Sequence, residues 1–308
     1  MKKIFISTST FAQFSSRPLE ILNNNGYDVE FNNLGRKLNK SEVLAAVPEY
    51  DAIIAGTELY NAKILDLGKS LKVISRVGVG LENIDLEYAN QKGIKVFKTQ
   101  TTPALSVAEL VLGLMLNLLR KISGHNQDLK SGIWKKQMGS LLNGKTLGVI
   151  GLGTIGKKLV EISKGMQLKY LAYDVIHDEK FAQEHGVRYC DLVELLTGSD
   201  VVSVHLSMSG KTKGLIGFDQ LKKMKNSSIL INTSRGDIIN EQDLEKAIRE
   251  NIIAGAGLDV FKEEPYKGTL TKYDNVIVTP HVGSYAKEIR VTMELEAVQN
   301  LLKGLKES

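Results

Sequence analysis

The sequence of 308 residues contains a single cysteine, Cys190. One thiol excludes an intramolecular disulfide and any metal site built from several cysteines, and we expect no bound metal. We interpret Cys190 as a small side chain that fills space in a core. A chain of this length can bury a large core without cross-links, and the length favours two domains over one.

Long apolar runs are also absent. A membrane-spanning helix needs ~20 consecutive apolar residues, whereas the longest run here, residues 110–119, is interrupted by Gly113 and Asn117. The first six residues resemble the charged start of a signal peptide, but the polar residues 7–10 follow too early for an apolar signal segment. We therefore expect a soluble, cytoplasmic protein without a membrane partner.

Neither sign of charge is in large excess. Forty Lys and Arg residues against 35 Asp and Glu residues leave a formal net charge of +5. That charge is too small for a nucleic-acid-binding tail or a polybasic membrane anchor. We therefore expect no nucleic-acid partner.

What the sequence does contain is an alternation of short apolar segments and longer amphipathic stretches. The amphipathic stretches include residues 61–67, 155–164 and 241–249. Apolar strands separated by helices are typical of parallel sheets covered by helices on both faces, so we expect a doubly wound α/β fold. The expected strands cover residues 4–7, 52–55, 73–75, 147–150, 170–173, 201–204, 229–231 and 276–278.

A polar interruption near residues 98–104 is the best candidate for a domain boundary. We expect Thr102 to be the N-cap and Pro103 the first helical position, followed by a long helix from Ala104 to about Arg120. The polar stretch 123–143 then leaves the alternation. It contains the only tryptophan, Trp134, which belongs either to a core or to an interface. Because residues 120–145 contain six Lys or Arg against the single acid Asp128, this region is either a solvated arm, a dimer contact or a rim that attracts anions.

An apolar strand runs directly into the motif Gly151-x-Gly153-x-x-Gly156. In a dinucleotide-binding turn, the first glycine permits the tight turn and the second lets the backbone approach a pyrophosphate. The third glycine lets the following helix pack closely on the strand. Thr154 and Ile155 open that helix, whose N-terminus offers N–H groups to phosphates.

The next expected strand ends in Asp174. Its carboxylate would accept hydrogen bonds from the adenosine ribose and repel a 2′-phosphate, so we predict NAD rather than NADP as the cofactor. The alternative is that the glycines form an ordinary turn and that Asp174 is a surface residue.

A second glycine pair, Gly78 and Gly80, also follows an expected strand. A third glycine is missing, because residue 83 is Asn, and no second strand ending in an acid follows at the right distance. We therefore expect no second dinucleotide site. Backbone N–H groups in the segment 77–80 would instead suit a small anion such as a carboxylate.

Three polar patches follow buried strands in the last third of the chain. They contain Arg235, the pair Glu263 and Glu264, and His281. Ligands of open parallel sheets bind at these carboxyl ends of strands. Beside a nicotinamide, an Arg could fix and polarise a 2-oxo acid, a His could move the hydroxyl proton, and a carboxylate could hold the His. Each residue also has a structural alternative, as a helix cap, a surface acid or a satisfied histidine.

Taken in order, these motifs, together with residues 75–85 and 106–110, resemble the D-isomer-specific 2-hydroxyacid dehydrogenase family over essentially the whole chain. The closest resemblance is to its phosphoglycerate-dehydrogenase-like branch. It implies a Rossmann-type NAD-binding domain at 99–281, inserted into a flavodoxin-like substrate domain formed by 1–98 and 282–308. It also implies a homodimer that transfers a hydride between nicotinamide and a small anionic D-2-hydroxy acid.

The same resemblance implies roles for individual residues. Arg235 would bind the substrate, Glu264 would orient His281, and His281 would be the acid–base group next to the cofactor. The family pattern, a Glu directly before Pro265, favours Glu264 over Glu263. The substrate would also contact Arg76, Val77, Gly78, Val79 and Gly80. Besides the glycine motif and Asp174, the cofactor would contact His205, Thr212, Thr233 and Asp259.

Two residues depart from the phosphoglycerate-specific pattern, which usually has a basic residue just after the third strand. Ala55 cannot hold a phosphate, and Glu58 would repel one; Arg76 or the pair Lys135 and Lys136 could compensate. The substrate stays open between 3-phosphoglycerate, which would place the protein in serine synthesis, and glyoxylate or hydroxypyruvate. An alternative from another class is a non-enzymatic NAD(H) sensor, because C-terminal-binding-protein corepressors are similar across the same motifs.

Overall fold

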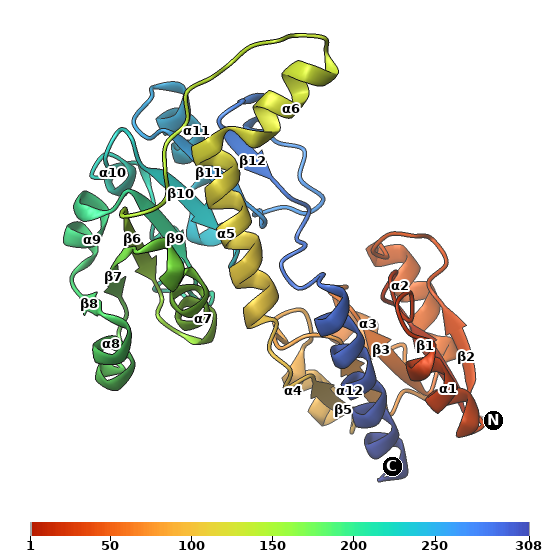
Figure 1. The fold of residues 1–308 in the computed structure, drawn as a ribbon. Coiled ribbons are helices and arrows are strands. Elements are labelled where there is room, and N and C mark those ends of the chain that lie inside the picture. The colour runs from red at the N-terminus through yellow and green to blue at the C-terminus, as the bar shows by residue number, and fades with distance from the viewer. Residues whose placement is uncertain (1, 308) are drawn as a thin grey trace. The chain divides into compact units, whose positions relative to one another are not determined.

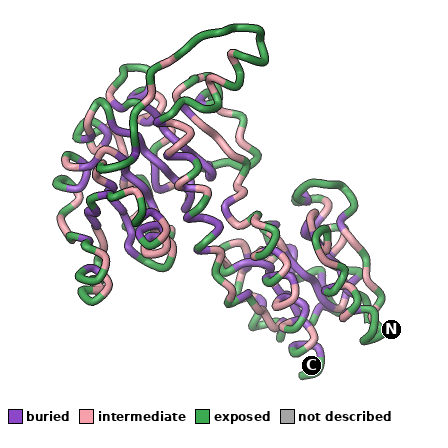
Figure 2. Tube along the Cα trace, in the orientation of Figure 1, coloured by how far each residue is buried: buried purple, intermediate pink, exposed green. Residues whose placement is uncertain are grey.

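The chain folds into two compact units in a computed structural model that describes residues 2–307 (Figure 1). One unit contains the residues up to Thr102 and those from Tyr285 onward, and the other contains Pro103–Ser284. The chain passes between the units a few residues later than the sequence-based boundaries after residues 98 and 281. In each unit, the buried residues are concentrated along the strands of a central sheet (Figure 2).

The unit that contains both chain ends is built on a five-stranded parallel sheet in the order β2-β1-β3-β4-β5, which is the flavodoxin-like order. Helices α1 and α12 cover one face, and α2, α3 and α4 cover the other. Its strands are β1 (Lys3–Ile6), β2 (Asp28–Phe31), β3 (Ala52–Ala55), β4 (Val73–Arg76) and β5 (Lys95–Lys98). Its helices are α1 (Arg17–Asn24), α2 (Lys40–Ala46), α3 (Ala62–Leu65), α4 (Leu86–Gln91) and α12 (Lys287–Lys306), with a 3-10 turn at Val47–Glu49.

The second unit is built on a seven-stranded parallel sheet in the order β12-β11-β10-β9-β6-β7-β8, a Rossmann order extended by one strand. Helices α5, α7 and α8 pack on one face, and α9, α10 and α11 on the other. Its strands are β6 (Thr146–Ile150), β7 (Lys169–Tyr173), β8 (Val187–Tyr189), β9 (Val201–Val204), β10 (Ile229–Asn232), β11 (Gly255–Leu258) and β12 (Val276–Val278). Its helices are α5 (Ala104–Arg120), α6 (Ile122–Lys130), α7 (Thr154–Ser163), α8 (Glu179–His185), α9 (Leu192–Gly198), α10 (Phe218–Leu221) and α11 (Glu241–Arg249), with 3-10 turns at Lys164–Met166, Gly236–Ile238 and Thr269–Lys272.

The expected bounds of the long helix are confirmed, because α5 runs from Ala104 to Arg120, but its expected N-cap is wrong. Helix α5 has Pro103, not Thr102, as its N-cap, and no side chain caps it. The Pro103 carbonyl accepts the first helical hydrogen bond from Val107 N and another from Ser106 Oγ. The N–H groups of the first turn of α5 therefore receive no acceptor from the side chain of the cap residue, and Pro103 contributes only its carbonyl.

The stretch 123–143 is partly helical. Its first part belongs to α6, which Lys121 separates from α5 in a left-handed conformation with φ of 54°. Trp134 follows α6 and is 82% exposed, so it does not belong to a core. Within residues 2–307, no helix combines the length and apolar character needed to cross a membrane.

Candidate active site

A contact between His281 and Glu264 brings together two of the three polar patches that follow buried strands. His281 follows β12, and its Nδ1 lies 2.9 Å from Oε2 and 3.1 Å from Oε1 of Glu264. The carboxylate in contact is that of Glu264, the residue directly before Pro265. Since Glu264 occupies Nδ1, Nε2 is the ring nitrogen that is turned away from this contact and can serve a ligand.

The turn that carries His281 is held by hydrogen bonds to Asp259, the residue that follows β11. Its Oδ1 accepts hydrogen bonds from Thr279 Oγ1 (2.6 Å) and Val282 N (2.8 Å), and its Oδ2 accepts one from Gly283 N (2.8 Å). Asp259 is 1% exposed, and this burial raises the pKa of its carboxyl group. The carboxylate therefore holds the Thr279 side chain and the backbone just after His281; its predicted contact with the cofactor stays a prediction.

Arg235 lies in a turn shaped by Asn232, the last residue of β10. Asn232 Oδ1 accepts hydrogen bonds from Ser234 N and Oγ, and Asn232 Nδ2 donates to the Arg235 carbonyl at 3.0 Å. The sequence-based prediction assigns no role to Asn232. The sequence feature that could have indicated a role is an amide side chain at the end of an otherwise apolar strand, because a buried polar group needs hydrogen-bond partners.

Gly236 brings the Arg235 turn against the loop that carries Glu264. A Cβ at position 236 would collide with the backbone at Phe261 and Lys262. Phe261 N donates to Glu264 Oε1 at 3.2 Å, so the same loop positions the carboxylate. The segments that carry Arg235, Glu264 and His281 therefore meet at the carboxyl ends of β10, β11 and β12, where parallel sheets bind ligands.

The glycine motif joins β6 to α7 at the point where the strand order reverses, between β6 and β9. Gly151 has φ of +97°, a conformation that favours glycine, and a Cβ at Gly156 would collide with the Gly151 carbonyl. A Cβ at Gly153, the N-cap of α7, would meet no atom within 4 Å. The strand and helix thus need their glycines at 151 and 156, while Gly153 opens space above the helix N-terminus.

Asp174 lies beside the same turn. Its Oδ2 accepts a hydrogen bond from Leu152 N (2.7 Å), and its Oδ1 accepts one from Ile176 N (3.1 Å). The carboxylate at the end of β7 is therefore held against the glycine motif by backbone donors, in the place where a dinucleotide-binding sheet presents its acidic residue to a ribose.

Two buried polar atoms near the strand ends have no partner among residues 2–307: Nδ1 of His205, after β9, and Oγ1 of Thr233, after β10. His205 Nε2 lies 2.8 Å from Ser203 Oγ, and burial lowers the pKa of His205 to about 4. Buried polar atoms normally have partners, so these atoms suit a polar ligand. Together with the open space above Gly153, they fit a bound dinucleotide.

Thr212 has a different environment. Its hydroxyl accepts a hydrogen bond from Ser209 N (2.7 Å) and donates one to the Ser207 carbonyl (2.8 Å). These bonds close the exposed turn after His205. Its predicted cofactor contact stays a prediction.

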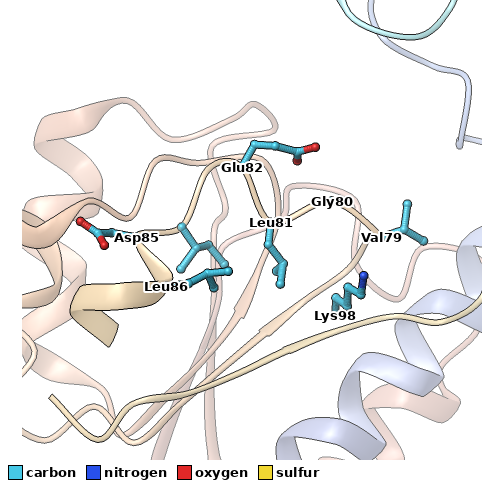
Figure 3. A pocket seen from close by; sticks show the side chains of 8 residues that line it. Val79, Gly80, Leu81, Glu82, Asp85, Leu86 and Lys98 are labelled. Carbon is cyan, nitrogen blue, oxygen red and sulfur yellow. The ribbon is translucent and has the colours of Figure 1, made fainter. Parts of the chain in front are cut away.

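In the other unit, the segment Val77–Gly80 follows β4. Gly78 has φ of +151°, and the Arg76 guanidinium lies where a Cβ of residue 78 would be. Val79 and Gly80 line a shallow, open pocket with Lys98 from the end of β5, and Figure 3 shows the Lys98 amine directed toward these two residues. The segment thus combines a glycine-containing backbone with two neighbouring cations, Arg76 and Lys98.

Comparisons with known proteins agree with this geometry. A family model described as "D-isomer specific 2-hydroxyacid dehydrogenase, NAD binding domain" matches residues 112–283, which lie within the second unit. The chain is 38% identical over 275 residues to the hydroxypyruvate reductase of Thermotoga maritima, covering 87% of this chain and 89% of that protein. It is 37% identical over 299 residues to the D-3-phosphoglycerate dehydrogenase of Archaeoglobus fulgidus, covering 94% of this chain.

The chain spans about half the length of the D-3-phosphoglycerate dehydrogenases that it matches, 56% for the Archaeoglobus fulgidus protein. Among solved structures, a putative D-3-phosphoglycerate dehydrogenase oxidoreductase from Ralstonia solanacearum is similar with a TM-score of 0.90 at 26% identity. That match covers all of this chain and 95% of the other. These proteins thus resemble the chain over nearly all of its length, in sequence and in fold.

Proposed function

Because the chain belongs to the D-isomer specific 2-hydroxyacid dehydrogenase family, whose cofactor is NAD, we propose that it interconverts a small D-2-hydroxy acid and the corresponding 2-oxo acid. The observation that carries this proposal is the contact between His281 Nδ1 and Glu264 Oε2 at 2.9 Å. Such a pair supplies an oriented proton donor and acceptor at the strand ends where the substrate would bind.

In the proposed reaction, Arg235 binds the substrate carboxylate and polarises its carbonyl through the planar guanidinium. When NADH is bound, it supplies the hydride for the C2 carbon. His281 donates a proton from Nε2 to the carbonyl oxygen during reduction and takes it back during oxidation. Glu264 keeps the imidazole in one orientation by holding Nδ1, and Asp259 fixes the turn on which the imidazole stands.

The cofactor would be held by the turn at Gly151–Gly156. The backbone N–H groups of Thr154 and Ile155 at the start of α7 would face its phosphates, supported by the helix dipole. Asp174 would accept hydrogen bonds from the adenosine ribose. His205 and Thr233, each with a buried atom that has no partner in the described part of the chain, are proposed to contact the rest of the cofactor.

The substrate carboxylate would also be held in the segment Val77–Gly80 by the backbone N–H groups of Val79 and Gly80, with Arg76 behind it. The N–H groups of Val77 and Gly78 already donate to the carbonyls of Ala55 and Arg76. The conformation of Gly78 supports this role, because the guanidinium of Arg76 occupies the position that any side chain would need. A positive group behind the N–H groups of Val79 and Gly80 suits an anion.

We propose further that the protein is a homodimer formed through α5, α6 and the segment that follows them. Trp134, Met138 and Leu141 in that segment are 82%, 90% and 68% exposed, and α6 contributes the exposed Ile122 and Leu129. Several large apolar side chains exposed in one segment of a folded protein mark a contact with another molecule.

The enzymatic proposal is tested by following NADH oxidation with hydroxypyruvate, glyoxylate, pyruvate and 3-phosphohydroxypyruvate in parallel, with NADH binding measured separately by fluorescence. Turnover of at least one 2-oxo acid supports the proposal. Binding of NADH without turnover of any of them would contradict it and favour a sensor of the NADH level.

A further inference from the structure

Ser203 lies on β9, the central strand of the seven-stranded sheet, and its side chain is bonded to that of His205. Ser203 is completely buried, and its Oγ lies 2.8 Å from His205 Nε2. Within residues 2–307 the Ser203 hydroxyl forms no other hydrogen bond. This hydrogen bond can run in either direction, because a hydroxyl group and an imidazole nitrogen can each donate or accept.

The imidazole of His205 is neutral near pH 7, because burial lowers its pKa to about 4. A neutral imidazole carries one hydrogen, on either Nδ1 or Nε2, and its other nitrogen is an acceptor. The direction of the hydrogen bond with Ser203 therefore also determines which ring nitrogen of His205 carries the hydrogen.

The number of polar groups left unpaired favours one direction. If His205 Nε2 donates to Ser203, two groups have no partner in the described part of the chain: the buried hydroxyl hydrogen of Ser203 and Nδ1 of His205. If Ser203 donates to Nε2, only the Nδ1–H group of His205 is left. An unpaired buried polar group costs about 1–3 kcal/mol, so the second arrangement is the more stable one. His205 then presents Nδ1 as a donor.

His205 lies next to the glycine motif. Its carbonyl oxygen is 2.9 Å from the position that a Cβ of Gly151 would occupy. In the register of β9 and β10, Val204 is paired with Asn232, so His205 and Thr233 are the next residues on adjacent strands. Each of these two residues has a buried polar atom without a partner among residues 2–307. Two atoms that need a partner thus belong to neighbouring strand ends beside the turn proposed to hold the dinucleotide.

From these contacts, and resting on the proposed function, we propose that Ser203 is a positioning residue that fixes the tautomer of His205, so that Nδ1–H donates a hydrogen bond to an oxygen of the bound dinucleotide. The ligand atom at this place is then an acceptor, such as the oxygen of a phosphate, carbonyl or hydroxyl group, and a ligand N–H group there is disfavoured. The hydroxyl group of Thr233 can donate and accept, so it places no such requirement on the ligand. Ser203 itself is completely buried and acts only through His205.

Nitrogen-15 NMR of the free protein, labelled at histidine, measures the tautomer directly. The signals of His205 are identified by their absence in His205→Gln. At pH 7 we expect the hydrogen of His205 on Nδ1 in the unaltered protein, and we expect this preference to be lost in Ser203→Ala. A hydrogen on Nε2 in the unaltered protein would overturn the proposal, and this result does not depend on whether Ser203→Ala folds.

Binding of NADH, followed by fluorescence, tests the consequence for the ligand. We expect Ser203→Ala to raise the Kd for NADH about fivefold, because an oriented donor is lost. The matched control is Ser199→Ala, which removes another completely buried hydroxyl, one that donates to the Leu195 carbonyl before β9. It should leave Kd unchanged. Equal Kd values in the two variants would overturn the role of Ser203 toward the ligand, as expected if Nδ1 binds only a water molecule.

Neither measurement requires turnover, so the proposal and the proposed function can fail separately. Turnover of a 2-oxo acid with equal Kd values in the two serine variants would overturn the role of Ser203 alone. The Nδ1–H tautomer and the fivefold change in Kd, without turnover of any 2-oxo acid, would support the role of Ser203 and contradict the proposed function. Absence of NADH binding to the unaltered protein would overturn both.

Discussion

Asp259 holds the turn of His281 with both its backbone and its side chain. His281 N donates to the main-chain carbonyl of Asp259 at 2.9 Å, and the Asp259 carboxylate accepts from the Thr279 hydroxyl and from the N–H groups of Val282 and Gly283. A catalytic imidazole on a turn needs such support, because a small displacement of a proton donor is costly to the reaction.

We expect Asp259→Asn to lower both stability and turnover. An amide can accept at one side only, so its NH₂ group would face either Gly283 N–H or the donors of Thr279 and Val282. Loss of a buried charged hydrogen bond costs about 1–3 kcal/mol. The urea concentration at the midpoint of unfolding and kcat should both decrease. Asp274→Asn, at an exposed acid of the same unit, should change neither. An unchanged urea midpoint together with an unchanged kcat in Asp259→Asn would contradict the positioning role of Asp259.

His205 should make stability dependent on pH. Burial lowers its pKa to about 4 from 6.5, so the unfolded chain binds a proton at pH values where the folded protein does not. The contribution to the free energy of unfolding is complete above about pH 6.5 and is lost as the pH falls toward 4, by about 3 kcal/mol. Between pH 7 and about 4.5, the free energy of unfolding measured with urea should therefore decrease more steeply for the unaltered protein than for His205→Gln. Parallel curves would contradict the burial of a neutral imidazole.

Asp174 should determine the choice of cofactor. Asp174→Ala removes the carboxylate that would repel a 2′-phosphate, so the ratio of kcat/KM for NADH over NADPH should fall on the order of tenfold. Glu179→Ala, at an acid nearby in sequence that is highly exposed, should leave the ratio as it is. An unaltered ratio in Asp174→Ala would refute the assignment of this residue to the ribose.

The exposed apolar segment should hold the dimer together. Light scattering of the unaltered protein should give about twice the chain mass of 33.9 kDa. The double variant Trp134→Ser and Met138→Ser should shift it to the monomer, while Val193→Ser, at a half-exposed valine on α9, should not. A monomeric unaltered protein would contradict the proposed assembly.

The sequence predicted the central strands of both sheets but not all strands. Strands such as β3 and β9 are buried on both faces and therefore read as continuous apolar runs. The edge strands β2 and β5 are only half buried and carry charged residues, so no such run marks them. Strand β11 reads Gly-Ala-Gly-Leu, because a side chain at Gly257 would press on Ile231 and on Leu114 of α5.

The site was predictable where chemistry lies at strand ends, and less so where side chains support it. Arg235, Glu264 and His281 are polar residues that follow buried strands, a pattern visible in the sequence. The supporting contacts of Asn232, Asp259 and Ser203 join residues that only the tertiary fold brings together. Spacing along a chain does not encode which carboxylate oxygen meets which backbone N–H.

The most direct test of the account is a comparison of steady-state turnover in three variants: His281→Ala, Glu264→Gln and Glu263→Gln. Loss of the acid–base group should reduce kcat by on the order of 10²–10⁴ in His281→Ala with NADH binding unchanged, and Glu264→Gln should also be impaired. Glu263→Gln, which leaves the contact with the imidazole in place, should retain normal kcat. Near-normal turnover in His281→Ala, or equal effects of the two Glu variants, would contradict the proposed acid–base pair.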